Sequence, residues 1–284
     1  MGLQLAGEGA LAFLQVIPGQ FVEIGLCEMA LPPVENIPDD LLDRAQRQVI
    51  LRRPFSFCDV EVTGQADVRM EILYCVLGPA TLRMTTLAEG DRISIIGPLG
   101  NGFSVPDGER CALLVAGGMG APPLQHLAGY LKANFPKMLV VVFAGAKSVA
   151  DLPFSVQSSD KNGIEATEFA GFGVESHIAT DDGSAGFRGF VTEHLSEWLK
   201  VNAPPAAETI IYSCGPEQML AEVAKIAAEH DIDCEVSMER MMACGIGLCQ
   251  SCAVEARVAG KTETVYKLCC KDGPVFNSKD IVFG

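Results

Sequence analysis

The stretch Leu113-Leu114-Val115-Ala116-Gly117-Gly118-Met119-Gly120-Ala121-Pro122-Pro123-Leu124 joins a short apolar run to a glycine-rich turn and two prolines. Such a run is typical of a buried strand, and proline is favoured in the first turn of a helix, so the stretch predicts strand, turn and helix. The amides and dipole of such a helix start can bind a phosphate. Because the full G-x-G-x-x-G spacing is missing, the motif alone is only suggestive. We take Gly117, Gly118 and Gly120 as candidate cofactor-binding residues.

The same alternation of apolar strand and helix continues to about residue 229. We expect further strands at Met138 to Ala144 and Thr209 to Ser213, and helices at Pro122 to Ala133 and Glu217 to His230. This order predicts a parallel sheet with helices on its faces. The later strand ends in Cys214, Gly215 and Pro216. Ligands bind at the carboxyl ends of parallel strands, so these three residues are candidates for a nicotinamide site, although Cys214 could be an ordinary buried thiol.

The first hundred residues have a different pattern, with short β-branched or alternating runs cut by turn residues. These runs predict an antiparallel barrel or sandwich, with strands at Phe21 to Ile24, Val60 to Val62, Arg69 to Val76 and Arg92 to Ile96. Between the first two lies a proline-rich and then polar stretch, Glu28 to Gln48, which we interpret as a surface excursion. We therefore expect domains at 1–105, 106–230 and 231–284.

The third domain carries the densest group of the eleven cysteines. The run Cys244-Gly-Ile-Gly-Leu-Cys249-Gln-Ser-Cys252 has the four-residue and two-residue gaps of plant-type [2Fe-2S] proteins. Its glycines let the backbone curl around a cluster and point amides at the sulfurs. A structural zinc site usually needs two C-x2-C halves, and only one such pair exists here. The fourth ligand is Cys269 or Cys270, and spacing does not decide between them.

Two motifs in the first domain suggest a flavin nucleotide. Leu51-Arg-Arg-Pro-Phe-Ser56 offers an arginine for a pyrophosphate and a serine hydroxyl for a flavin ring nitrogen, although alone it could be a surface turn. Gly97-Pro-Leu-Gly-Asn-Gly-Phe103 is a glycine-rich turn that would let a flat cofactor approach the backbone, or it could be an interdomain hinge. Gly100 is our candidate in that turn.

Composition excludes several other classes of protein. The chain has 36 acidic and 21 basic residues and a formal net charge of -15, which disfavours nucleic acid and anionic membrane surfaces as partners. The apolar runs are far shorter than the roughly 18 residues of a membrane-spanning helix. We see no secretion signal, and the cysteines indicate metal binding more than disulfides, so we expect a cytoplasmic location.

Taken in chain order, these motifs resemble the ferredoxin reductase family and, within it, the electron-transfer subunits of the class B dihydroorotate dehydrogenases. The resemblance covers nearly the whole chain and includes three further runs, Pro18-Gly-Gln-Phe21, Ala179-Thr-Asp-Asp-Gly-Ser184 and Cys270-Lys-Asp-Gly-Pro-Val-Phe276. In the family the fourth cluster ligand directly precedes the Asp-Gly-Pro run. The resemblance therefore favours Cys270, and it implies the ligand set Cys244, Cys249, Cys252 and Cys270.

The resemblance also implies how the flavin is bound. Arg53 and Ser56 contact FAD, Pro54 and Phe55 shape its site, and Gly78 and Thr81 lie beside its phosphates. Ala80 departs from the family, which usually has glycine before the threonine. We also expect the first strand to be incomplete, because the N-terminus begins late. The excursion Glu28 to Gln48 is longer than we expect between the first strands of such a barrel.

The fold class implied is an antiparallel FAD-binding β-barrel, a parallel α/β NAD-binding domain and a small C-terminal [2Fe-2S] domain. The implied partner is an FMN-containing catalytic subunit that oxidises dihydroorotate in pyrimidine biosynthesis, in a heterotetramer with two copies of each subunit. Electrons then pass through the cluster and FAD to NAD+. The alternatives are a reductase component for another partner, such as a hydrogenase, a glutamate synthase-like enzyme or an oxygenase, and a non-enzymatic iron-sulfur sensor.

Two finer expectations concern specificity and docking. The loop Gly145-Ala-Lys-Ser148 has one lysine and no arginine cluster for a 2′-phosphate, so we expect NAD in preference to NADP. The segment Met238 to Ile246, with Met238, Met241 and Met242, has the mixture of residues found at protein interfaces, although the methionines could instead pack inside the molecule.

Overall fold

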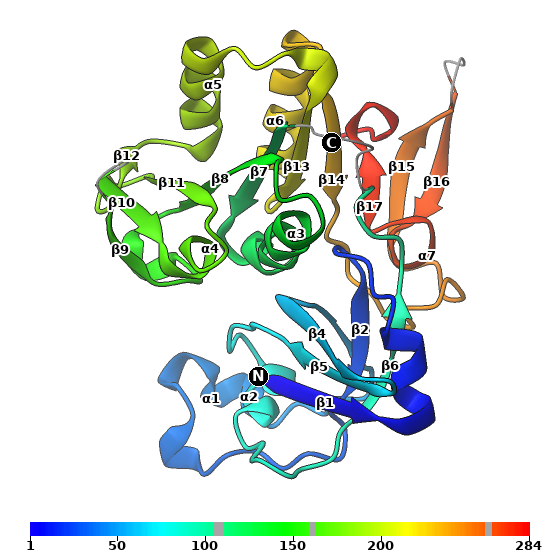
Figure 1. Cartoon of the computed structure of the whole chain (residues 1–284). Coiled ribbons are helices and arrows are strands. Elements are labelled where there is room, and N and C mark those ends of the chain that lie inside the picture. Colours follow the sequence, from blue (N-terminus) through cyan, green and yellow to red (C-terminus); the bar gives the residue numbers. More distant parts are fainter. Residues whose placement is uncertain (105–110, 160–162, 259–262) are drawn as a thin grey trace.

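A seven-stranded sheet forms the centre of the molecule (Figure 1). The structure is a computed structural model that describes residues 1–104, 111–159, 163–258 and 263–284. All neighbouring strands run parallel except the last pair, which is antiparallel. The predicted parallel sheet is therefore confirmed. Its strands, in sheet order, are β12 (Phe187–Arg188), β11 (Glu175–Thr180), β8 (Leu139–Ala146), β7 (Cys111–Gly117), β13 (Thr209–Cys214), β14 (Asp233–Ser237) and β17 (Val275–Asn277).

Helices cover both faces of this sheet, because its central strand is apolar on both sides. In β7, Leu114 packs with α3 (Ala121–Asn134) on one face. Leu113 and Val115 pack with α5 (Val191–Asn202) and α6 (Glu217–Glu229) on the other, as Figure 1 shows. The expected strands and helices of this region are found within two residues of their predicted ends. Three further short elements complete it, namely β9 (Val156–Ser159), β10 (Gly163–Ala166) and α4 (Thr167–Ala170).

The N-terminal region consists of two three-stranded antiparallel sheets, which agrees with the expected antiparallel architecture. One has the order β1 (Gly2–Ala6), β5 (Asp67–Glu71) and β4 (Asp59–Gly64), and the other has the order β3 (Arg53–Ser56), β2 (Phe21–Gly25) and β6 (Ser94–Leu99). They enclose a core that includes Val22, Ile24 and Met70. The predicted strand Arg69 to Val76 was too long, since β5 ends at Glu71.

Two expectations about this region need correction. Every residue of β5 has a partner in β1, so the expected shortfall in the first strand is not seen along β5. The excursion after β2 is also more than a surface loop. The excursion contains α1 (Leu42–Ala45). Its residues Ile37, Leu41 and Ala45 are buried against Leu82 of α2 (Pro79–Met84).

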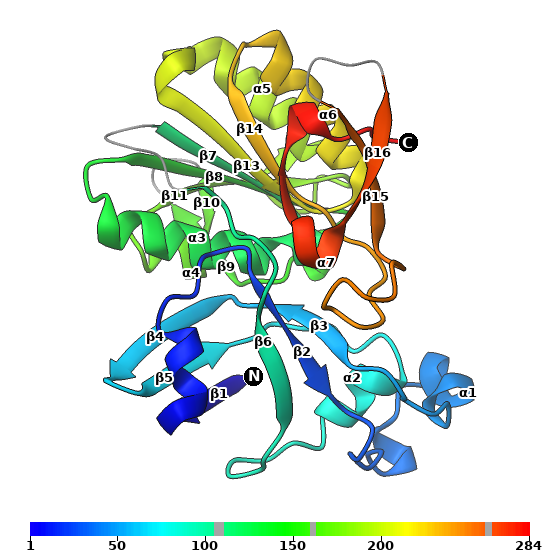
Figure 2. The same cartoon turned by 90° about the vertical axis from the view of Figure 1, so that its right-hand side faces the viewer.

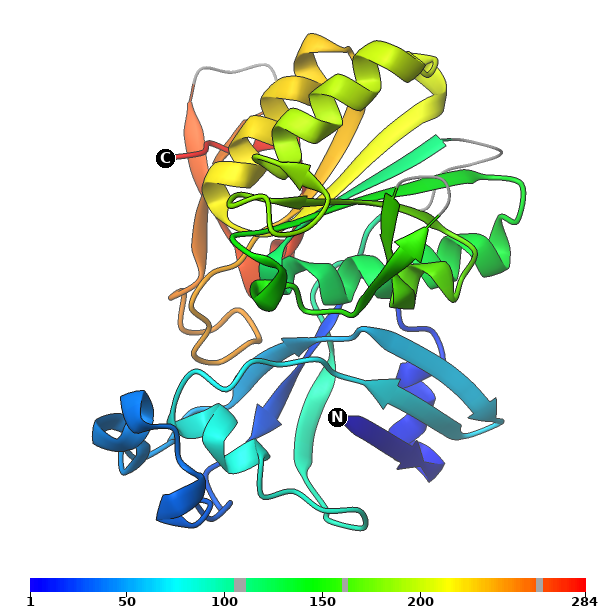
Figure 3. The ribbon, with the colours of Figure 1, turned by 90° about the vertical axis from the view of Figure 1, so that its left-hand side faces the viewer.

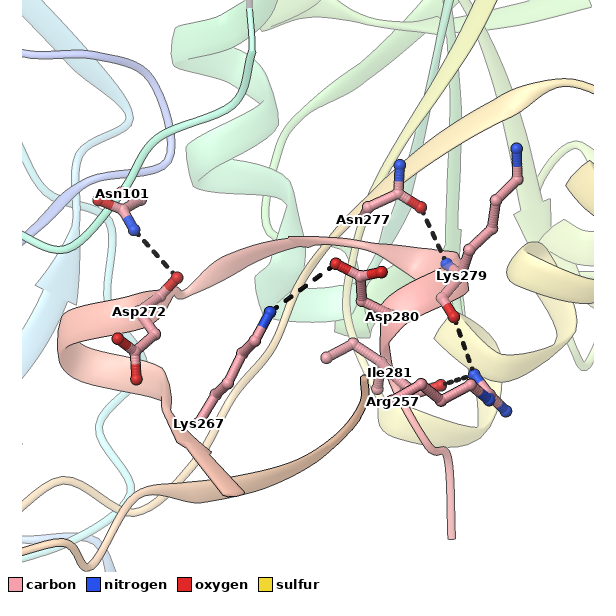
Figure 4. Close-up of polar contacts among 8 residues, drawn as sticks. All are labelled: Asn101, Arg257, Lys267, Asp272, Asn277, Lys279, Asp280 and Ile281. Carbon is pink, nitrogen blue, oxygen red and sulfur yellow. Dashed lines mark hydrogen bonds and ion pairs between the residues drawn. The ribbon is translucent and has the colours of Figure 1, made fainter. Parts of the chain in front are cut away.

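The C-terminal region is a hairpin and a short helix attached to the edge of the central sheet (Figure 2). The hairpin strands are β15 (Ala253–Arg257) and β16 (Thr264–Leu268), and α7 (Cys269–Asp272) leads into β17. Figure 4 shows the contacts that hold it: Arg257 donates to the carbonyls of Lys279 and Ile281, and Lys267 pairs with Asp280 at 3.8 Å. β14 and β17 lie in the range expected for the third domain, yet they complete the central sheet.

The domain limits stay a prediction, and the limit at 105/106 lies outside the described residues. Within the described ranges, no helix combines the length and apolarity that crossing a membrane requires.

We expect Gly120→Ala to lower the free energy of unfolding by about 1–3 kcal/mol, the usual effect of an overpacked buried site. A Cβ at Gly120 would lie 2.1 Å from the carbonyl oxygen of Cys214, so the turn after β7 would have to move away from the end of β13. Denaturant unfolding measures the effect. Gly9→Ala is the control, because a Cβ there meets no atom within 4 Å. Equal stability of the two variants would contradict this packing.

Candidate flavin, nicotinamide and iron-sulfur site

A cavity of about 640 Å³ lies where the three regions of the chain meet. The N-terminal sheets, the carboxyl ends of the central strands and the segment after β14 each form one wall. Most of the residues predicted to bind a cofactor line it: Pro54, Phe55, Ser56, Thr81, Gly117, Gly118, Gly120, Cys214, Gly215 and Pro216. Arg53, Gly78 and Gly100 are not among the lining residues.

The first wall is built on β3 and the start of α2. Phe55 meets Tyr74 edge to face, with 6.4 Å between ring centroids, which forms an aromatic surface for a planar ligand. The hydroxyl of Thr81 accepts bonds from the amides of Leu77 and Gly78 at 2.9 and 3.3 Å, so it fixes the turn into α2. Tyr74 lies in the stretch that was predicted as a strand, and its place beside the cavity was not predicted because the chain leaves β5 at Glu71.

Arg53 and Gly100 have other contacts in this structure. The guanidinium of Arg53 donates to the carbonyls of Leu51 and Arg52 at 2.9 and 3.0 Å. Gly100 faces the C-terminal segment, where a Cβ would lie 2.6 Å from Cδ of Pro274. Its left-handed φ of +72° and this close approach explain why glycine is needed there.

The second wall lies at the carboxyl ends of β7 and β13. A Cβ at Gly117 would lie 2.6 Å from the sulfur of Met219, and Gly215 has a φ of +155°, so neither position tolerates a side chain. Burial raises the pKa of the Cys214 thiol to about 12, so this thiol is neutral at physiological pH. The two glycines leave the backbone at the carboxyl ends of these strands open to a ligand.

The third wall comes from the segment after β14 and was not predicted as part of a cofactor site. Met238, Glu239, Arg240 and Met242 line the cavity, and Arg240 pairs with Glu217 of α6 at 2.8 Å. The predicted interface role for Met238 and Met242 was wrong in part. Met238 is 2% exposed and Met242 is half-buried against the same core, because both turn towards the sheet and the cavity.

The four predicted cluster cysteines form two neighbouring groups beside this wall. The Cys252 and Cys270 sulfurs are 3.3 Å apart, and the amide of Gly247 donates to Cys270 Sγ at 3.2 Å. In the second group, the amide of Cys249 donates to Cys244 Sγ at 3.4 Å. The loop that carries Cys244, Cys249 and Cys252 projects between the central sheet and the N-terminal sheets (Figure 2), and Cys270 lies on α7.

Cys269 points away from these sulfurs. Its thiol donates to the carbonyl oxygen of Met238 at 3.1 Å, and the residue is fully buried. Burial raises the pKa of Cys269 to about 12, whereas hydrogen bonds from Ser251 lower the pKa of exposed Cys249 to about 6. Burial raises the pKa of Cys270 to about 12 as well, so the direction of the side chain, and not the pKa, distinguishes Cys269 from Cys270.

The predicted cluster cysteines form two groups and do not converge on one point. In the described residues, no three His, Cys, Asp or Glu side chains converge as ligands of one metal ion. A tetrahedral zinc site would require four ligands at one point, whereas a [2Fe-2S] cluster uses four cysteines around two irons. The two groups, with amides directed at their sulfurs, fit an iron-sulfur cluster, and the type of cluster is a matter for the proposal below.

Comparisons with known proteins agree with this arrangement. Residues 239–282 match the family described as "Iron-sulfur cluster binding domain of dihydroorotate dehydrogenase B". Among solved structures, one described as an NADH-dependent reduced ferredoxin-NADP oxidoreductase is 25% identical, with a TM-score of 0.71 over 99% of this chain and 84% of that chain. The FAD/NAD binding domain of a nitric oxide dioxygenase from Vibrio cholerae, 20% identical, has a TM-score of 0.55 over 83% of this chain and 91% of that chain, which shows a shared fold.

These features define a ferredoxin reductase-like protein with a C-terminal iron-sulfur domain. Proteins from Geobacillus thermodenitrificans and Listeria monocytogenes named "Dihydroorotate dehydrogenase B (NAD(+)), electron transfer subunit" are 36% and 33% identical to it. The matches cover 93% and 92% of this chain and 86% and 92% of the relatives. The chain belongs to the family of electron transfer subunits of dihydroorotate dehydrogenase B (NAD(+)).

We expect Cys270→Ser to lose most of the iron and the cluster absorbance, and Cys269→Ser to retain both. The reason is that Cys270 faces Cys252, whereas Cys269 bonds to Met238. Iron analysis and visible spectra of the purified variants are the measurements. Full cluster content in Cys270→Ser, together with loss in Cys269→Ser, would reverse the assignment.

Proposed function

We propose that the chain binds FAD and a [2Fe-2S] cluster and transfers electrons from a dihydroorotate-oxidising partner to NAD+. The proposal depends on the wall that the cavity shares with the cysteine region. Met238 lines the cavity, and its carbonyl accepts a hydrogen bond from Cys269, the residue next to Cys270. The cluster would supply single-electron transfer, the flavin both one- and two-electron transfer, and the nicotinamide only the two-electron step.

The residues of the cavity divide into three proposed roles. Pro54, Phe55 and Ser56 on β3 hold the flavin ring against the N-terminal sheets, and Thr81 orders the turn beside its phosphates. Arg53 would leave its backbone contacts to pair with the pyrophosphate. Gly117, Gly118 and Gly120, with Cys214 to Pro216, form the side on which the nicotinamide lies.

Cys244, Cys249, Cys252 and Cys270 are the proposed cluster ligands. The chain contributes amides at Gly247 and Cys249 and keeps the pair Cys252 and Cys270 buried, at 1% and 3% exposure. Burial and amide donors are two means by which a protein adjusts a cluster potential.

The partner is proposed to be an FMN-containing catalytic subunit, in a heterotetramer with two of each subunit. The outer surface of the cluster loop offers a docking face, because Met241 and Leu248 are 87% and 77% exposed and Ile246 is 48% exposed. Large exposed apolar side chains gathered on one loop are unusual on a free surface and typical of interfaces.

A cytoplasmic location also remains a prediction.

A second candidate is a reductase component for a different redox partner. The structural similarity to the ferredoxin-NADP oxidoreductase over 99% of this chain favours it. Purification from the native host separates the two, because dihydroorotate-dependent reduction of NAD+ by the co-purified complex supports the first candidate. The non-enzymatic sensor is excluded if bound FAD turns over with NADH.

We expect NADH to bleach the flavin absorbance of the purified chain under anaerobic conditions, and NADPH to do so at least tenfold more slowly. Lys147 is the only cationic side chain in the loop after β8, so little positive charge is available there to balance the negative charge of the 2′-phosphate of NADPH. Stopped-flow spectroscopy with each nucleotide measures the rates. Equal rates would show that this loop does not select the nucleotide.

We expect the double variant Met241→Glu and Leu248→Glu to lose association with the catalytic subunit while NADH still reduces its FAD. Two carboxylates would have to be desolvated at the apolar docking face. Gel filtration of the mixed subunits measures association. Val201→Glu, at an 83% exposed position on α5, a helix that lies far from the cluster loop, is the control (Figure 1). Normal complex formation by the double variant would remove this loop from the interface.

A further inference from the structure

Glu23, in the middle of β2, is buried without a partner. Among the described residues it is the only Asp, Glu, Lys or Arg side chain in the core, and its exposure is 0%. Neither carboxylate oxygen has a hydrogen-bond partner. Burying such a group costs several kcal/mol unless it is compensated, so a carboxylate here is expected to serve a purpose other than packing.

The side chain of Glu23 is directed at the loop that carries the predicted cluster ligands. Its neighbours Val22 and Ile24 point into the core between the N-terminal sheets, so Glu23 points outwards. On that side it meets Gly245, where an added Cβ would lie 2.5 Å from Glu23 Cγ and 2.6 Å from Oε1. Figure 3 shows this loop lying over the N-terminal sheets. The carboxylate therefore lies directly beneath the residue that follows Cys244.

No counter-ion is bonded to this carboxylate. The Arg52 guanidinium donates to the backbone carbonyl of Glu23 at 3.4 Å and to Ser94, and Arg53 donates to the carbonyls of Leu51 and Arg52. Both arginines only attract the carboxylate through space. If Arg53 turns to the FAD pyrophosphate, as proposed above, its attraction for the Glu23 carboxylate becomes weaker.

The ionisation of Glu23 follows from the same surroundings. Burial raises its pKa to about 7, the two arginines lower it, and the nearby Cys249 raises it further. A pH above this pKa favours the carboxylate, and its charge can then be tested by an uncharged replacement of the same shape.

We propose that the Glu23 carboxylate lowers the reduction potential of the cluster and so favours passage of its electron to the flavin. The inference rests on the cluster assignment of the proposed function. Each electron added to a cluster adds negative charge, and a fixed negative charge nearby opposes that addition more strongly in a low-dielectric interior than in water. Glu23 would act through the cluster and would touch neither the substrate nor the nucleotide.

The test is an anaerobic redox titration of the full chain with both cofactors bound, at about pH 8.5, above the pKa of about 7. Cluster and flavin are followed separately by electron paramagnetic resonance and absorbance in the wild type and in Glu23→Gln. We expect the cluster potential of Glu23→Gln to be more positive, with normal iron content and an unchanged flavin potential. Glu61→Gln, an exposed carboxylate on β4, is the control and should leave both potentials unchanged.

The other outcomes overturn the inference or its premise. An unchanged cluster potential in Glu23→Gln, or an equal shift in cluster and flavin, would show that the carboxylate does not tune the cluster. Loss of iron in Glu23→Gln would also overturn the inference, since it would make Glu23 a structural support of the loop. Failure of the wild type to assemble any cluster would instead refute the proposed function.

Discussion

The backbone around Pro274 holds the three regions of the molecule together. The Gly273 carbonyl accepts from the Asn101 amide at 2.6 Å, and the Asn101 side chain donates to the Asp272 carbonyl at 2.9 Å (Figure 4). The Pro274 carbonyl accepts from the amide of Met238, and the next residues pair with β14 as β17. One extended segment therefore contacts the N-terminal region, the central sheet and the cysteine helix at once.

The arrangement of the cofactor cavity and the cysteines follows from that junction. α7 ends immediately before Gly273, so Cys270 is placed within a few residues of the joint. Met238, bonded to Pro274, forms part of the cavity wall and also accepts from Cys269. A change in the angle between the regions would alter the cavity and its distance from the cysteines together. Efficient electron transfer needs such fixed spacing, and backbone hydrogen bonds provide it without relying on mobile side chains.

Electrostatics at the junction differ on its two sides. On the cavity side desolvation raises the pKa of the Cys214 thiol to about 12, so this thiol is neutral. On the side of the cluster loop, Cys249 is exposed with a lowered pKa, and Glu23 is a buried carboxyl without a bonded counter-ion. The cavity wall at the end of β13 therefore carries a neutral thiol, whereas a buried carboxyl lies beside the loop of the proposed cluster.

The sequence by itself determined the features that depend on local pattern. The apolar run and glycines of Leu113 to Gly120 predicted the strand and turn, and the spacing of Cys244, Cys249 and Cys252 predicted the iron-sulfur site. The amphipathic helix α5 was not predicted, although its buried residues Val191, Leu195 and Leu199 follow a helical spacing. Nor did local pattern indicate the third wall of the cavity, whose residues lie far in sequence from the glycine turns.

Only the tertiary structure decided which groups meet across long sequence separations. Spacing left Cys269 and Cys270 equivalent, and they differ because α7 turns one thiol towards Met238 and the other towards Cys252. Glu23 carried no signal in a strand that otherwise looks like part of a β-sheet core. Its position under Gly245 depends on how two regions more than two hundred residues apart in sequence pack together. The burial and solvation of a side chain are set by such packing and not by its neighbours in sequence.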